Sequence, residues 1–130
     1  MPATTYITNK ILDHICNDGT YTPVTLYMAL FNGDPAGAGT EILTAATGGY
    51  ARQQIPAATW AAAASGSKAT SGALTFGPFS SDPASATHGC LMDAATAGNK
   101  VWTGALTVAK DAGIGDTISF ASGEIVISIT

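Results

Sequence analysis

The sequence predicts an all-β domain, an antiparallel β-sandwich or jelly roll, with one short helix at its N-terminus. Short runs of apolar and β-branched residues recur after residue 20, and most are bounded by Gly, Pro, Asn or Asp. A helical spacing of apolar residues occurs near the N-terminus. The length of 130 residues suits one domain. We therefore expect a single domain over 1–130, with a helical segment at 1–20 and the β-sandwich at 21–130.

The first element is a predicted helix that begins at Thr4 or Thr5, either of which suits the N-cap position, and continues to about Cys16. Isoleucines that recur every four residues place an apolar stripe along one face: Ile7, Ile11 and Ile15. The sequence Asn17-Asp18-Gly19 predicts the end of the helix and a turn. We expect this helix to lie over one side or edge of the sheet.

The next element, residues 24–31, predicts a central strand, because both sets of alternating side chains are largely apolar and would be buried on each face. Residues 36–49 are small, polar and rich in glycine, which indicates a long loop. A further strand is predicted at residues 50–55. Residues 57–72, rich in Ala, Ser, Thr and Gly, predict a strand followed by a loop.

The second half of the chain predicts more short strands, at residues 74–76, 88–92, 101–108, 117–120 and 124–129. In the second of these, His88, Cys90 and Met92 would share one face and Leu91 the other. Residues 121–123 predict a hairpin connection between the last two strands. The isoleucines of the last strand are expected to point one way: Ile125, Ile127 and Ile129.

The composition is poor in charge, with 11% charged residues against about 25% in average proteins. Such a surface suits a protein covered by partners or by copies of itself, or an extracellular β protein. The 5 basic residues, against 9 acidic ones, form no basic stripe, so we expect no nucleic-acid partner. No apolar run approaches the roughly 20 residues that span a bilayer, so we expect no membrane contact.

No candidate catalytic site emerges from the residues. Nucleophilic catalysis needs an activated Ser or Cys near a His and an orienting acid, and the chain has no Gly-x-Ser-x-Gly turn. His14 and Cys16 would diverge on a helix, while His88 and Cys90 lack the usual spacing of zinc ligands. We therefore expect no enzymatic activity, no cofactor and no metal site. Free thiols are the expected state of Cys16 and Cys90, with a disulfide between them left open.

Five residues are candidates for contact with a partner protein: Tyr50, Arg52, Trp60, Asp34 and Glu41. Tyr50 and Trp60 are large aromatic side chains of the kind that anchor interfaces. Arg52 is the one charge inside its predicted strand, so we expect it to be paired or at an interface. Asp34 lies in the turn before the long loop, and Glu41 lies within that loop.

Segments spread through most of the chain carry a family resemblance. They are the helix over residues 7–15, Thr25-Leu26-Tyr27-Met28-Ala29-Leu30-Phe31, Gly49-Tyr50-Ala51-Arg52-Gln53, Leu74-Thr75-Phe76-Gly77, the stretch 89–94, and Gly115-Asp116 before the last two strands. On these segments the chain resembles a family of small virion proteins of tailed bacteriophages. Members are often labelled tail-fibre proteins, and some look like head-decoration or cement proteins.

The resemblance implies a non-enzymatic structural protein of a phage particle, made in the bacterial cytoplasm and built into the virion. The first hypothesis is a capsid decoration or cement protein on the head surface. It would bind across subunits of the major capsid protein, stabilise the DNA-filled head and associate with itself as a dimer or trimer. The alternative is a tail-fibre or receptor-binding module that recognises a host-surface glycan or protein. That role would expose Trp60, Tyr50 and the loop at residues 36–49.

Overall fold

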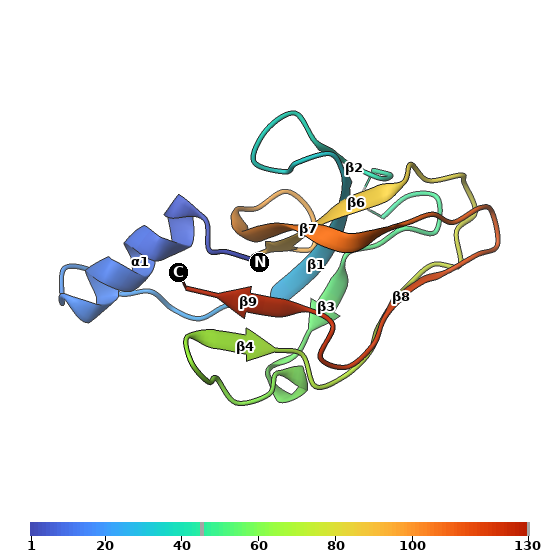
Figure 1. Cartoon of the computed structure of the whole chain (residues 1–130). Coiled ribbons are helices and arrows are strands. Elements are labelled where there is room, and N and C mark those ends of the chain that lie inside the picture. Colours follow the sequence, from blue (N-terminus) through green and yellow to red (C-terminus); the bar gives the residue numbers. More distant parts are fainter. Residues whose placement is uncertain (45, 130) are drawn as a thin grey trace.

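The computed structural model describes residues 1–44 and 46–129 and is mainly β, with one α-helix near the N-terminus (Figure 1). Every ladder between named strands is antiparallel, so the predicted fold class is confirmed. The elements are α1 (Thr5–Ile15), β1 (Leu26–Asn32), β2 (Thr40–Glu41), β3 (Gln53–Ile55), η1 (Ala57–Thr59), β4 (Ser67–Ala69), β5 (Leu74–Phe76), β6 (Ala86–Met92), β7 (Lys100–Lys110), β8 (Ile118–Phe120) and β9 (Val126–Ser128).

The larger layer is a five-stranded sheet with the order β2-β1-β6-β7, in which β3 also pairs with β1. One edge of β1 is shared by β3 and β2, and its other edge pairs with β6. Met28 and Leu30 of β1 face the main core, while Ala29 and Phe31 face a smaller cluster on the other side. The predicted central strand, buried on both faces, is therefore confirmed.

The second layer is a ribbon made of two short ladders, β4 with β9 and β5 with β8. Between the ladders, the Thr70 N–H donates to the Ile125 carbonyl at 3.0 Å and Thr70 accepts from the Gly123 N–H at 2.7 Å. The predicted hairpin between the last two strands is wrong, because β8 and β9 pair with different partners and residues 121–123 continue the ribbon. Of the three isoleucines expected to point one way, Ile125 and Ile127 are buried, whereas Ile129 is 56% exposed.

The main core lies between the two layers and is built around aromatic rings. Tyr50 stacks on Phe76 at 6.0 Å between ring centroids, and Phe76 meets Phe120 edge-on at 6.1 Å. Such contacts add to the burial of apolar area, the main favourable contribution to folding. The buried members of this cluster are Met28, Leu30, Ile42, Tyr50, Ile55, Leu74, Phe76, Phe79, Ala86, Leu91, Ile118, Phe120, Ile125 and Ile127.

Residues 57–72 have the reverse of the predicted order. A single 3-10 turn, η1, comes first and the strand β4 comes later in the segment. The alanine-rich start has no alternation of apolar and polar side chains that would give a strand one buried face. The strand predicted at residues 50–55 is confined to β3, and β7 continues two residues beyond its predicted end at 108.

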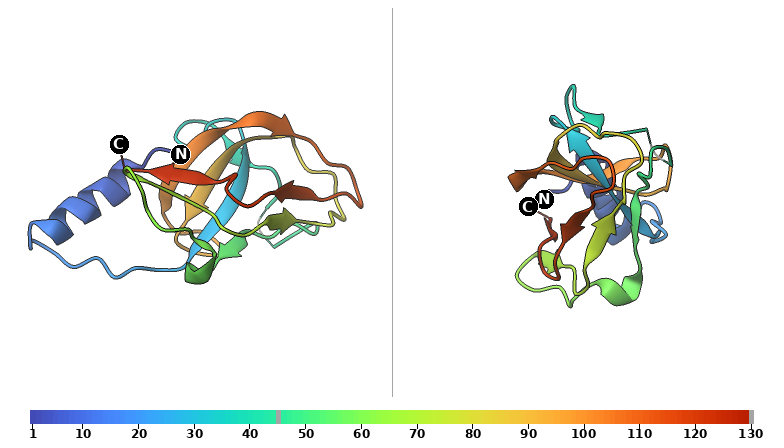
Figure 2. Two further views of the ribbon diagram at one scale, coloured as in Figure 1. Left: turned by 60° about the horizontal axis from the view of Figure 1, so that its bottom comes forward. Right: turned by 90° about the vertical axis from the view of Figure 1, so that its right-hand side faces the viewer.

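Helix α1 starts at the β body and extends away from it (Figure 2). Thr4 takes the N-cap position, but its hydroxyl donates to the Lys100 carbonyl of β7 at 2.8 Å and makes no capping bond. Asn17, with φ of 60°, takes the left-handed conformation that follows the end of the helix, as predicted. The expected packing of α1 over the sheet holds for its first turns only: Ile7 is buried and Ile11 is partly buried, whereas residues 12–15 are exposed.

Candidate functional site

Arg52 and Glu41 form an ion pair inside the protein. The Arg52 Nε–H donates to Glu41 Oε1 at 3.1 Å, and Arg52 Nη2 contacts the same carboxylate oxygen. Arg52 Nη1 donates to the carbonyls of Ala94 at 3.0 Å and Ala97 at 2.7 Å. The two side chains are only 6% and 15% exposed. One guanidinium therefore ties β2 to the chain before β3 and to the loop after β6.

Tyr50 completes this cluster. Its hydroxyl donates to Glu41 Oε2 at 2.9 Å and accepts from the Leu30 N–H of β1 at 3.0 Å. Only 1% of Tyr50 is exposed, and this burial, more than its neighbours, raises the pKa of Tyr50 far above the usual value. The exposed Tyr50 that a receptor-binding role would need is therefore not found, because its ring fills the core and its hydroxyl links two strands.

Trp60 and Asp34, the other two candidates, lie in different places. Trp60 is half-buried against the main core, and its backbone pairs with Thr70. Asp34 is exposed at the start of a tight turn, where its carboxylate accepts from the Ala36 N–H at 2.9 Å. The structure thus brings Tyr50, Arg52 and Glu41 together and leaves these two apart. Contact of any of the five with a partner stays a prediction.

The outer part of α1 has an apolar face without a partner among the described residues. Ile7 is 2% exposed, whereas Leu12 is 60% and Ile15 is 74% exposed. The chain then returns to β1 through residues 16–25, which are almost all exposed. We call residues 8–25 the arm. One feature of the sequence points to the exposed face. Leu12 lies beside the isoleucine stripe and makes the apolar surface of the helix wider.

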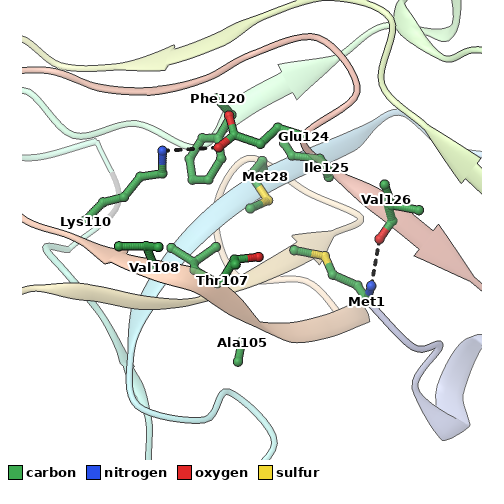
Figure 3. Close-up of a pocket in the computed structure, with 11 residues that line it drawn as sticks. Met1, Met28, Ala105, Thr107, Val108, Lys110, Phe120, Glu124, Ile125 and Val126 are labelled. Atoms are coloured by element: carbon green, nitrogen blue, oxygen red, sulfur yellow. Dashed lines mark hydrogen bonds and ion pairs between the residues drawn. The ribbon is translucent and has the colours of Figure 1, made fainter.

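A groove lies between β7 and the strands β8 and β9, with a volume of about 660 Å³ (Figure 3). We call it the β7 groove. Its walls are mainly apolar, and its lining residues are Met1, Met28, Ala105, Leu106, Thr107, Val108, Lys110, Phe120, Glu124, Ile125 and Val126. The sequence did not predict this groove, because its two walls come from distant parts of the chain.

The charged groups that line the β7 groove are already engaged with protein atoms. Lys110 Nζ lies 4.7 Å from the centroid of the Phe120 ring, donates to the Ser119 carbonyl at 3.0 Å and pairs with Glu124 at 3.4 Å. At the other end, the Met1 ammonium donates to the Val126 carbonyl at 2.7 Å. Partial burial lowers the pKa of this ammonium group. The groove therefore offers apolar surface and backbone groups rather than free charge.

The two cysteines are free thiols in different environments. Cys16 is exposed on the arm, whereas Cys90 is fully buried, with its sulfur 3.3 Å from Met92 Sδ. Burial raises the pKa of the Cys90 thiol to about 12. The neighbouring His88 meets the Thr87 hydroxyl at 2.9 Å through Nδ1. Over residues 1–44 and 46–129, no three His, Cys, Asp or Glu side chains gather as metal ligands would.

Within the described part of the chain, no helix combines the length and the apolar character needed to cross a membrane.

Together these features describe a small antiparallel β protein with an exposed apolar face on its helix and an internal ion pair. The family can then be stated: the chain belongs to the phage virion family described as podophage GP4 fiber I protein gp80, whose profile matches residues 2–128. The resemblance to phage virion proteins is confirmed by this match. Comparison with curated proteins gives no match. The chain is thus a structural protein of a bacteriophage particle, from a family named for a fibre.

Proposed function

We propose that the protein is a non-enzymatic subunit of the phage fibre and is held in the particle through the arm. The observation that carries this proposal is the exposed apolar face of α1, with Leu12 and Ile15 on its outer part. Burying one such side chain is worth about 1.5–3 kcal/mol. The occupant of this face is a neighbouring fibre protein with a complementary apolar surface, because the family is one of virion proteins.

The arm has the geometry of an attachment element. It is held on both sides: before it, the Thr4 N–H donates to the Val101 carbonyl at 2.9 Å, and after it the chain enters β1. A segment held at both ends loses less conformational entropy on docking than a free tail does. Weak attachment of each copy is sufficient when many copies act together in one particle.

The test changes the apolar face and keeps the helix. The double variant Leu12→Gln and Ile15→Gln retains good helix formers and a folded body, and it is expected to lower incorporation into particles at least tenfold. The matched control is Asn9→Gln with Lys10→Gln, on exposed positions of the same helix. Phage lacking the native gene are complemented with each variant, and the protein is quantified by mass spectrometry against the major capsid protein. Normal incorporation of the Leu12 and Ile15 variant would overturn the proposal.

A capsid decoration protein is the second candidate, and the low charge of 11% favours it. The cores of protein interfaces are depleted in charged residues, and a decoration protein covers much of its surface with capsid and with copies of itself. Copy number separates the two candidates. A number of the same order as the major capsid protein would favour decoration, with contacts across capsid subunits and a dimer or trimer. A far smaller number would favour the fibre.

A receptor-binding role is a weaker candidate for the same fibre. It would rely on aromatic side chains at the surface, but Tyr50 is buried and Trp60 packs against the main core. Glycan binding that disappears in Trp60→Ala, with the fold retained, would support this role.

A further inference from the structure

The N-terminal residues of the chain form an inserted strand between β7 and β9. On the β7 side, the Thr103 N–H donates to the Pro2 carbonyl at 3.4 Å, and Ala3 pairs antiparallel with Trp102. On the β9 side, the Ser128 N–H donates to the Met1 carbonyl at 2.9 Å. Residues 1–4 thus connect β7 to β9, and so connect the two layers of the sandwich at this point.

The β7 groove lies next to these residues, with Met1 in its lining. Residues 1–4 contact β7 through Val101, Trp102 and Thr103, whereas β7 continues to Lys110. On the β6 side, His88 pairs with Ala105 and Ala86 with Lys110, so residues 106–109 have no partner there. No strand or bridge of the described chain pairs with them on the outer edge either. Unpaired backbone groups of an edge strand are a template for another strand.

The space between the two layers is also shaped to receive side chains. Gly89 and Gly104 are paired across β6 and β7, and the side chain of Met1 lies over both. A Cβ atom on Gly104 would come within 3.1 Å of Met1 Cγ, and one on Gly89 within 2.5 Å of Met1 Cε. The inserted strand therefore points an apolar side chain into the sandwich. Beyond Met1, apolar side chains from Met28, Phe120 and Ile125 line the continuing space.

We propose that the β7 groove receives an extended segment of another protein of the particle, which adds to β7 in line with residues 1–4. The segment runs antiparallel to β7, bonds to the backbone of residues 106–109, and points apolar side chains at alternate positions into the groove. It carries no charge in its middle, because Lys110 and Glu124 already pair with each other.

This site is independent of the arm, so either proposal can fail while the other holds. The first experiment supplies the strand in the same chain. Six alternating Val and Thr residues are added before Met1, so that they run in line with residues 1–4 along β7 towards Lys110. The control extension has six Gly and Ser residues. The amides of residues 106–109 are expected to exchange hydrogen at least tenfold more slowly in the Val-Thr chain. Equal exchange in both chains would overturn the proposal.

The second experiment tests the groove in particles. Val108 lines the groove and Ile114 lies outside it, and both are 70% exposed. Val108→Lys is expected to reduce incorporation at least tenfold, while Ile114→Lys is incorporated normally and both proteins melt like the parent. Normal incorporation of Val108→Lys would overturn the proposal. If raising the concentration of the purified wild-type protein protects residues 106–109 from exchange, the occupant is a second copy and the assignment to another protein is wrong.

Discussion

The cluster of Arg52, Glu41 and Tyr50 and the outer part of α1 differ in both polarity and exposure. The first is charged and polar, yet its ion pair is 6% and 15% exposed. The second carries Leu12 and Ile15, which are 60% and 74% exposed. Average behaviour is the opposite, since charged residues are mostly exposed and aliphatic ones mostly buried. In this protein the polar cluster links strands inside the fold, whereas the apolar face on α1 lies at the surface.

The physical reason for the difference lies in what each group requires. A buried charge is tolerated when its partner and its hydrogen bonds are complete, as they are around Arg52. An apolar side chain has no hydrogen bonds to complete. Its exposure to water costs free energy, which burial against a partner would recover. The distribution of charge therefore separates residues that hold the subunit together from residues that can join it to others.

Arg52→Ala is expected to give the largest loss in the free energy of unfolding, about 3–5 kcal/mol, because Glu41 would stay buried without its cation. The control is Lys110→Ala, which breaks a pair whose side chains are 29% and 44% exposed. That loss is expected to be below about 1 kcal/mol. Chemical denaturation of the purified proteins measures both. Equal losses would show that the internal pair has no special role in stability.

The two ends of α1 give a second test. Ile7→Ala is expected to cost about 2–4 kcal/mol, because Ile7 is 2% exposed and its removal leaves a cavity. Ile15→Ala, the matched control on the same helix, is expected to change stability by less than about 0.5 kcal/mol. Thermal and urea unfolding give the comparison. A large loss in Ile15→Ala would mean that the outer helix packs on its own body in solution.

Tyr50→Phe tests the polar part of the cluster at a smaller scale. It removes one hydroxyl and leaves the Leu30 N–H and a Glu41 oxygen short of a partner. The expected loss is about 1–2 kcal/mol. Tyr27→Phe, in a half-buried ring on β1, is the control and is expected to change little. A stability equal to that of the parent would mean that water replaces the lost hydroxyl.

Much of the fold could be predicted from local pattern. Alternation identified β1, β6 and β7, and it placed Cys90 and Met92 on the opposite face from Leu91. The pairing of strands could not be predicted in the same way. Alternation indicates which face of a strand is apolar, but not which strand lies beside it. The false hairpin at residues 121–123 shows this limit: a short Gly-containing turn suits both a hairpin and a ribbon that changes partner.

The candidate site was predicted less well, for a related reason. Arg52 was expected to be paired or at an interface, and the structure pairs it with Glu41. The stripe on α1 predicted a helix and its apolar face, but helical period carries no information on what covers that face. The β7 groove had no local signal, because its walls come from residues 105–110 and 120–126, which the fold brings together.

The two thiols allow the internal and the exposed region to be compared in the particle as well as in the free protein. This test uses chemical labelling and no substitution. In the free protein at pH 8, iodoacetamide is expected to label Cys16 and to leave Cys90 unmodified. Cys90 is buried, and with a pKa of about 12 only roughly one ten-thousandth of it is thiolate at that pH. Unfolding in guanidinium exposes both thiols, and mass spectrometry counts the labels. In intact particles, Cys16 lies in the arm and is expected to react at least several-fold more slowly than in the free protein. Equal labelling of Cys16 in both states would mean that the arm stays uncovered, so that attachment depends on another surface.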